Sequence, residues 1–212
     1  MLDASARALL ARPLEAAAAA IDRPHVTPDR LTVAGLALGV AAAGAAAMQL
    51  WGVALTLWLV SRLADGLDGT LARRRRARAP RGDQSRESHA GGFLDITADF
   101  VAYGYTVVGV AIGAANQFDA PWWPFLLVLL TYYVNGTAFL AFSSIAERTG
   151  RTLDDGRSLS FLGRIAEGTE TIAVHALWMI VPFWSWQIAL GWSVFVAVSA
   201  AQRIIVGYLR LR

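Results

Sequence analysis

The sequence predicts an all-α protein with six membrane-spanning helices preceded by an amphipathic surface helix. Of its 212 residues, 56% are hydrophobic and 17% are charged, which is more apolar than a typical soluble domain. The apolar residues form long runs instead of short core patterns, and the arginines gather in only some of the connections between them. We therefore expect one membrane domain that covers residues 1–212. The chain has no cysteine, which excludes a disulfide framework, a thiolate metal site and a cysteine nucleophile.

The N-terminal segment, residues 5–24, is predicted to be a helix that lies on the membrane surface. Leu9, Leu10 and Leu14 can share one helical face, while Arg12 and Glu15 lie elsewhere on the helix. The alternative is a solvated, alanine-rich helix, because the separation into two faces is modest.

Residues 28–209 are predicted to form the six-helix bundle. Thr27 followed by Pro28 is a typical helix N-terminus. The small residues Gly35 and Gly39 indicate close packing of the first span. The predicted spans cover about residues 31–50, 51–73, 93–115, 122–146, 159–183 and 186–208. The second is long enough to cross a bilayer only if its helix continues beyond the apolar run 51–64 through two aspartates.

The distribution of arginine predicts the orientation of the bundle. The connections near residues 51, 116–121 and 183–186 contain no arginine, whereas residues 73–86 and 148–157, the N-terminal segment and the C-terminus do. The positive-inside rule therefore puts both termini and the arginine-rich connections in the cytoplasm. A cluster of tryptophans marks the opposite edge, as an aromatic belt would: Trp51, Trp122, Trp123, Trp184 and Trp186. We expect an integral protein of a bacterial inner (cytoplasmic) membrane.

Four aspartates lie within the predicted spans, where ionisable residues are costly and indicate function. Asp65 and Asp68 are three residues apart, and Asp95 and Asp99 are four apart, so each pair shares a helix face. If the two helices are neighbours, four carboxylates converge and need a positive partner. Mg²⁺ joins carboxylates to substrate phosphates, so the pattern indicates a metal ion and a polyanionic substrate.

The same residues resemble the signature of the CDP-alcohol phosphatidyltransferases. The segment 65–73 reads Asp-Gly-Leu-Asp-Gly-Thr-Leu-Ala-Arg, and the segment 91–99 reads Gly-Gly-Phe-Leu-Asp-Ile-Thr-Ala-Asp. These match D-x-x-D-G-x-x-A-R and G-x-x-x-D-x-x-x-D at every fixed position. The surface helix, the Thr-Pro-x-x-Leu-Thr start of the first span and the six spans are also similar to the family, so the resemblance covers nearly the whole chain.

The resemblance implies a reaction and roles for these residues. It implies transfer of a phosphatidyl group from a CDP-alcohol, most often CDP-diacylglycerol, to a hydroxyl of a small polar acceptor, with release of CMP. Asp65, Asp68 and Asp95 would bind one or two Mg²⁺ or Mn²⁺ ions, and Asp99 would act as general base and could also contact a second ion. The implied donor-binding residues are Gly69, Ala72, Arg73 and Gly91. The family also implies a homodimer.

One departure from the family pattern lies between Arg73 and Gly91, where the spacer is about twice its usual length. The residues 74–90 are rich in arginine and are predicted to loop into the cytoplasm. A longer loop adds little entropic cost, so the two helix ends can still converge. The segment could bind anionic lipid head groups or act as a topology anchor alone.

The acceptor site is predicted from polar residues in the later spans. The candidates are Asn135, Arg164, Glu167, Glu170 and Arg203. Their mixed charges favour a zwitterion such as serine, or a neutral polyol, over a phosphorylated acceptor. The pair Arg164 and Glu167 could equally form a structural ion pair.

Two other classes of function compete with the transferase. Carboxylates inside a membrane could line the path of an ion transporter, and a relative that has lost catalysis could bind lipid only. Transport explains neither Gly69 nor Arg73 at this spacing, and the intact signature argues against lost catalysis. The net charge of +3 could suggest nucleic-acid binding, but the positions of the arginines fit membrane topology, so we expect no nucleic-acid partner.

Overall fold

The computed structural model describes residues 2–78, 86–149 and 168–212, and every regular element in these residues is helical. In chain order the elements are α1 (Leu2–Ile21), α2 (Pro28–Ala47), α3 (Trp51–Arg78), α4 (Arg86–Phe118), α5 (Trp123–Arg148), α6 (Gly168–Ile180), the short 3₁₀ helix η1 (Pro182–Trp184) and α7 (Ser185–Leu211). The prediction of an all-α fold is confirmed for these residues.

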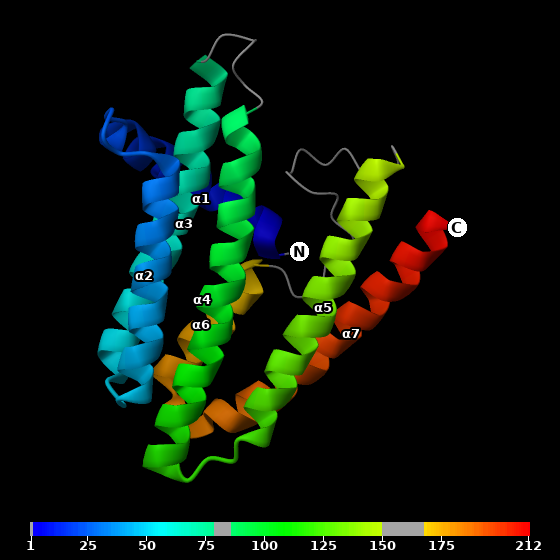
Figure 1. The fold of residues 1–212 in the computed structure, drawn as a ribbon. Helices are drawn as coiled ribbons and strands as arrows, with labels where there is room; N and C mark the ends of the chain where they lie inside the picture. The colour runs from blue at the N-terminus through cyan, green and yellow to red at the C-terminus, as the bar shows by residue number, and fades with distance from the viewer. Residues whose placement is uncertain (1, 79–85, 150–167) are drawn as a thin grey trace.

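The helices form two packed groups that diverge toward one end of the molecule (Figure 1). In one group, α2 packs against both α3 and α4, and α6 packs mainly against α3. In the other group, α5 packs along α7. The turns α2–α3 and α4–α5 and the α6–α7 junction all lie at the same end of the bundle (Figure 1). These connections contain no arginine, and each contains a tryptophan or lies directly next to one, so the predicted sorting of residues between the two ends agrees with the fold.

Small residues allow α2, α3 and α4 to approach closely. A Cβ atom added at Gly39 would lie 3.1 Å from Ser61 Oγ and 3.2 Å from Ala102 Cβ. One added at Gly109 or Gly113 would overlap the backbone carbonyl of Ala43 or Ala46. The predicted packing role of the glycines in α2 is therefore confirmed, and α4 contributes a glycine face of its own.

The outer surface of the bundle is apolar, as expected of a protein surrounded by lipid. Large hydrophobic side chains such as Leu59 of α3, Leu126 of α5 and Ile205 of α7 are about half exposed. Four described helices are long and apolar enough to cross a bilayer, at 28–47, 90–118, 123–148 and 182–211. These correspond to the first, third, fourth and sixth predicted spans.

The second and fifth predicted spans are not among these four. The helix α3 has 28 residues, which is long enough, but its second half is strongly charged. The helix α6 has 13 described residues, and the start of the fifth predicted span, 159–167, lies outside the described residues. The structure therefore supports a polytopic membrane fold with four candidate spans.

The start of α2 has the predicted cap. Thr27 has extended backbone angles, and its Oγ1 accepts a hydrogen bond of 3.3 Å from the backbone N–H of Arg30. Pro28 occupies the first turn, where its missing N–H costs nothing. This cap fixes where α2 begins and so places Thr32 one turn into the helix, next to the site described below.

Candidate metal centre

The helices α3 and α4 bring three of the four predicted aspartates together. Asp65, Asp68 and Asp95 each offer a carboxylate oxygen, and these oxygens all lie within 4.8 Å of one another. The convergence expected from spacing is therefore found between side chains of α3 and α4, two helices that both pack against α2. A set of carboxylate oxygens at this separation fits a hard divalent cation such as Mg²⁺ or Mn²⁺. We call the four residues Asp65, Asp68, Asp95 and Asp99 the carboxylate centre.

Asp68 is the most enclosed member of the carboxylate centre, at 4% exposed. The Thr32 hydroxyl of α2 donates to Asp68 Oδ2 at 2.5 Å, so the first helix of the bundle orients this carboxylate. Thr32 itself is buried and belongs to the Thr-Pro-x-x-Leu-Thr segment at the start of α2. That segment therefore both begins the helix and supports the site, a role for which its sequence gives no chemical signal.

Asp99 lies outside the group of three and pairs with an arginine. Arg62 Nη1 lies 2.6 Å from Asp99 Oδ1 and 3.7 Å from Asp65 Oδ1. The Asp65 and Asp99 carboxylates are themselves close enough to interact. The arginine thus contacts a carboxylate of α3 and one of α4, and it supplies part of the positive charge that the aspartates need.

Sequence reasoning missed Arg62, although a signal was present. Arg62 interrupts the apolar run 51–64, and an arginine inside a membrane span is as unusual as an aspartate. It precedes Asp65 by three residues, so both side chains share a face of α3. The family signature begins at Asp65 and therefore does not draw attention to it.

The guanidinium of Arg62 is enclosed by aromatic rings and a hydroxyl. Its carbon Cζ lies 4.9 Å from the ring centre of Trp58 and 5.3 Å from that of Tyr103. Its Nη2 donates to Ser61 Oγ at 3.1 Å, and the Ser61 hydroxyl donates to the Gly35 carbonyl at 2.6 Å. Stacking and hydrogen bonds hold the planar group in one orientation.

The implied donor-binding residues Gly69, Ala72, Arg73 and Gly91 are all exposed or half-buried. Arg73 and Ala72 are exposed, and Gly69 is half-buried. Arg73 Nη2 donates to Thr70 Oγ1 at 3.1 Å, and a Cβ on Gly69 would lie 3.2 Å from Arg73 Nη1. A Cβ on Gly91 would lie 3.5 Å from Asp29 Oδ1. The surface beside the aspartates is therefore lined by small residues and one exposed cation, which suits a phosphate-bearing ligand.

The described acceptor candidates come from three different helices. Asn135 of α5 and Glu170 of α6 each have a buried side-chain oxygen without a hydrogen-bond partner in the described structure. Arg203 of α7 is buried, with its guanidinium 5.7 Å from the ring centre of Phe139. Arg164 and Glu167 lie outside the described residues. The acceptor site therefore stays a prediction.

The arginine-rich stretch 74–90 was predicted to be a loop, and this prediction is wrong for its two ends, which are helical. Residues 74–78 continue α3 and residues 86–90 begin α4, while 79–85 lie outside the described residues. Arginine is a good helix former, so the polar run extends the helix beyond the apolar part. The longer spacer is thus absorbed largely by extra helical turns at both ends.

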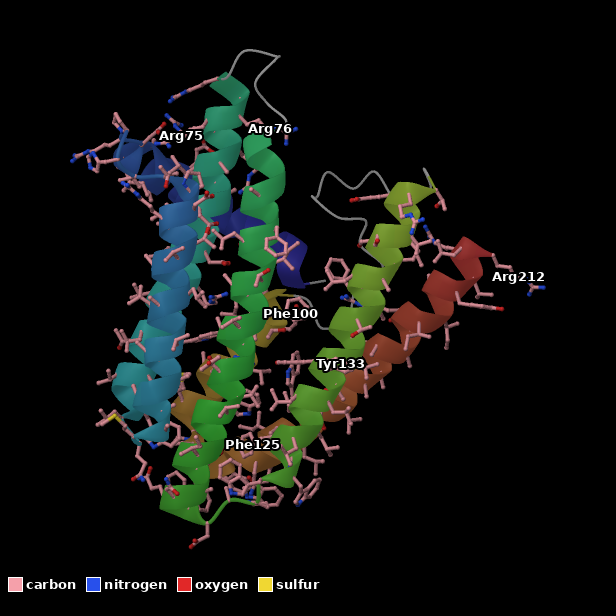
Figure 2. The ribbon with its side chains drawn as sticks, viewed as in Figure 1. Arg75, Arg76, Phe100, Phe125, Tyr133 and Arg212 are labelled. Atoms are coloured by element: carbon pink, nitrogen blue, oxygen red, sulfur yellow. The ribbon has the colours of Figure 1, made fainter. Side chains whose placement is uncertain are left out.

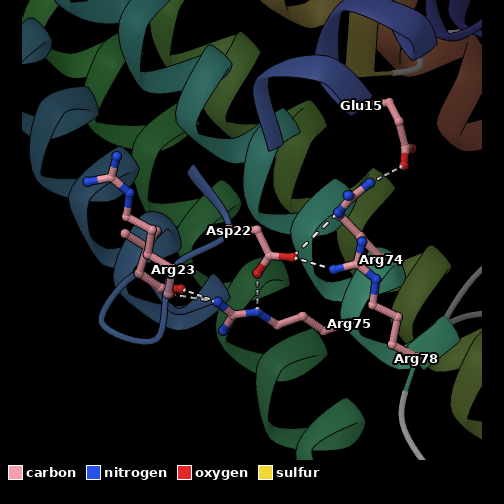
Figure 3. Close-up of polar contacts among 7 residues, drawn as sticks. Glu15, Asp22, Arg23, Arg74, Arg75 and Arg78 are labelled. Carbon is pink, nitrogen blue, oxygen red and sulfur yellow. Dashed lines mark hydrogen bonds and ion pairs between the residues drawn. The ribbon is translucent and has the colours of Figure 1, made fainter. Parts of the chain in front are cut away.

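Three of these arginines bind the N-terminal segment (Figure 3). Arg74 pairs with Glu15 at 3.1 Å, and Arg75 and Arg78 pair with Asp22 at 3.0 Å each. The hydrogen bond from Arg75, together with the charges of its neighbours, lowers the pKa of Asp22 below its ordinary value. We call these five residues the N-terminal clamp: Glu15, Asp22, Arg74, Arg75 and Arg78. The clamp fastens α1 to the end of α3.

The two groups of helices also meet across α4 and α5. The ring of Phe100 on α4 lies against Gly136 of α5, where a Cβ atom would overlap it (Figure 2). Arg75 and Arg76 lie toward one end of the bundle and Phe125 toward the other (Figure 2). The carboxylate centre lies on the half of α3 and α4 that leads to the arginine end.

The fold and the site together define a polytopic α-helical membrane protein with an acidic, metal-compatible centre near one end of its bundle. Residues 25–199 match the model of the CDP-alcohol phosphatidyltransferase family, so the chain belongs to that family and is one of its membrane enzymes. The signature recognised in the sequence is thereby confirmed. Membership in an enzyme family favours transfer chemistry over the ion-transporter alternative.

Two kinds of relative support this assignment. The chain is 34% identical over 197 residues to the inner membrane protein YnjF of Escherichia coli K12, covering 91% of this chain and 88% of that protein. It is similar in structure to the Mycobacterium tuberculosis phosphatidylinositol phosphate synthase PgsA1 with CDP-DAG bound, with a TM-score of 0.61, 26% identity, and coverage of 94% and 92%. The apo form of PgsA1 matches the fold with a TM-score of 0.56, 24% identity, and 92% coverage of each chain.

Proposed function

We propose that this protein transfers a phosphatidyl group from CDP-diacylglycerol to the hydroxyl of a small polar acceptor and releases CMP, as a step of phospholipid synthesis. The observation that carries the proposal is the convergence of Asp65, Asp68 and Asp95 within 4.8 Å at the family signature. The donor class is supported by the PgsA1 relative, whose structure holds CDP-DAG. The site faces the cytoplasm of a bacterial inner membrane, consistent with the inner-membrane relative.

The proposed roles divide the site between metal binding, donor binding and proton transfer. Asp65, Asp68 and Asp95 would hold Mg²⁺ or Mn²⁺, which when bound would neutralise the donor pyrophosphate and stabilise the leaving CMP. Arg73 would contact donor phosphates, and Gly69, Ala72 and Gly91 would let the nucleotide approach α3 and α4. Asn135, Glu170 and Arg203, with Arg164 and Glu167, are the proposed acceptor-contacting residues.

Asp99 is the proposed general base. It would take the proton from the acceptor hydroxyl, whose oxygen then forms a bond to the lipid-linked phosphorus while the bond from that phosphorus to CMP breaks. Asp99 is about one-third exposed, so an incoming hydroxyl can reach it. Arg62 holds the other side of its carboxylate, which fixes its direction. A carboxylate so paired must act as a base chiefly through its position.

The proposal also includes the class of acceptor and the assembly of the protein. Mixed acidic and basic residues in α6 and α7 favour a zwitterion or a neutral polyol over a phosphorylated acceptor. The PgsA1 relative is a phosphatidylinositol phosphate synthase, so phosphorylated inositol belongs among the tested acceptors. A homodimer is proposed from the family resemblance.

The test is CMP release by the purified full-length chain from CDP-diacylglycerol with Mg²⁺. Serine, glycerol phosphate, inositol and inositol phosphate are compared with a reaction that has no acceptor. We expect release that depends on one acceptor and stops with a chelator. Asp95→Asn is the matched negative control, since it removes one proposed ligand with little change in shape. Release that needs no acceptor, or that persists in this variant, would contradict the proposal.

A further inference from the structure

Arg62 occupies the bridging position between the two helices of the carboxylate centre. Its Nη1 lies 2.6 Å from Asp99 Oδ1 on α4 and 3.7 Å from Asp65 Oδ1 on α3. A divalent ion shared by Asp65 and Asp99 would have to lie in the same small volume. The arginine therefore stands where a second metal ion would bind, while Asp65, Asp68 and Asp95 remain grouped for a first one.

The surroundings of Arg62 keep it at that position. The side chain is 6% exposed, and its guanidinium is stacked near Trp58 and Tyr103. Ser61 accepts a hydrogen bond from Nη2 and is itself bound to the backbone of α2. Moving the guanidinium away would break these contacts and bury a charge without partners, which is strongly unfavourable.

We propose that Arg62 is a positioning residue that replaces a second metal ion, so that the carboxylate centre binds a single divalent cation. Two positive groups this close repel strongly in a partly buried site, so the guanidinium and a second ion exclude one another. The arrangement leaves Asp99 outside the metal sphere, oriented by Arg62 toward the acceptor. The inference rests on the proposed function, because it requires a metal at Asp65, Asp68 and Asp95.

The test counts bound Mn²⁺ by electron paramagnetic resonance on the purified full-length chain in lipid nanodiscs. We expect one Mn²⁺ per chain at saturation. Two Mn²⁺ per chain would overturn the role of Arg62 and leave the metal-dependent function intact. No bound Mn²⁺ would overturn the proposed metal centre and this inference with it. The number of bound ions therefore distinguishes failure of this inference alone from failure of the proposed function, without any mutation.

A matched pair of variants tests the separation of Asp99 from the metal. Asp95→Asn removes a proposed ligand and is expected to weaken Mn²⁺ binding by at least about tenfold. Asp99→Asn keeps the shape and can still accept the hydrogen bond from Arg62, so Mn²⁺ affinity and stoichiometry should stay unchanged. Weakening of Mn²⁺ binding in Asp99→Asn to the same degree as in Asp95→Asn would overturn the proposal.

Replacement of the arginine completes the test. Arg62→Gln removes the charge but retains hydrogen-bond donors, and it should admit a second, weaker Mn²⁺ seen as a second binding phase and as spin–spin broadening of the resonance. Arg62→Lys keeps a cation and should bind one Mn²⁺ like the parent chain. A folded Arg62→Gln variant that still binds one Mn²⁺ would overturn the exclusion by Arg62. If Arg62→Gln does not fold, the parent stoichiometry and the aspartate pair decide the question.

Discussion

The arginines of α3 take part in two arginine–carboxylate clusters, and the arginine is much more deeply buried in one cluster than in the other. Toward the middle of the helix, Arg62 is 6% exposed and faces Asp65 and Asp99. At its end, Arg78 is 62% exposed, and together with Arg74 and Arg75 it binds Glu15 and Asp22 in the N-terminal clamp. Arginines of α3 thus pair with carboxylates at two places along the helix, and the surroundings of the two places differ.

The degree to which the arginine is buried distinguishes a cluster in the proposed functional site from one that only attaches α1 to the bundle. Around Arg62, each charge is costly to bury and is retained only with partners, which is why such a cluster indicates a site. In the N-terminal clamp, water and salt screen the charges, and each pair contributes little. The first cluster belongs to the proposed binding site, whereas the second fastens α1 to the bundle.

The largest predicted difference between the two clusters is the effect of their aspartates on the rate of catalysis. Asp65→Asn removes a carboxylate from the centre, and the rate of CMP release should fall by about 10³-fold, since electrostatic stabilisation of the reacting phosphate is lost. Asp22→Asn makes the same chemical change in the clamp and should leave the rate within a few-fold of the parent. The rates of CMP release by both variants are measured under identical conditions. Similar losses of rate in the two variants would refute the proposed difference between the two clusters.

A second effect is expected on stability. Arg62→Ala removes the buried guanidinium and leaves the clustered, partly exposed carboxylates of Asp65 and Asp99 without their cation, so it should lower the free energy of unfolding by about 3 kcal/mol, at the lower end for a broken buried pair. Arg74→Ala breaks partly exposed pairs and should cost only about 0.2–1 kcal/mol. Unfolding of both variants in mixtures of mild detergent and dodecyl sulfate would measure the difference. Equal losses would mean that burial does not distinguish the two clusters.

Much of the site could be predicted from the sequence because its information is local. The spacing of Asp65 and Asp68, and that of Asp95 and Asp99, determines which side chains share a helix face, and three of the four converge. The helix start at Thr27 and Pro28 is equally local and was also correct. These features depend on helical geometry and on residues within one turn of one another.

Features that depend on contacts between distant segments could not be predicted in this way. The pairing of Arg62 with Asp99 joins two helices, and the bond from Thr32 to Asp68 joins two others. The residues 74–78 were expected to leave the membrane as a loop, but they continue α3, and three of their arginines pair with Glu15 and Asp22. No spacing rule links residue 22 to residue 75, so the N-terminal clamp follows only from the structure.

The smallest predicted effect is the response of the N-terminal clamp to acid. The hydrogen bond from Arg75 lowers the pKa of Asp22 in the folded protein below its ordinary value of 3.8. The stabilisation by this carboxylate is therefore complete above the ordinary pKa of the unfolded chain and is lost only as pH falls through the lower folded value. The parent chain should melt slightly above Asp22→Asn at pH 6, and the gap should close in strong acid and also in high salt at pH 6. A melting gap that persisted in both conditions would show that Asp22 acts through packing and not through charge, and the contrast between the two clusters of α3 would then fail at its exposed end.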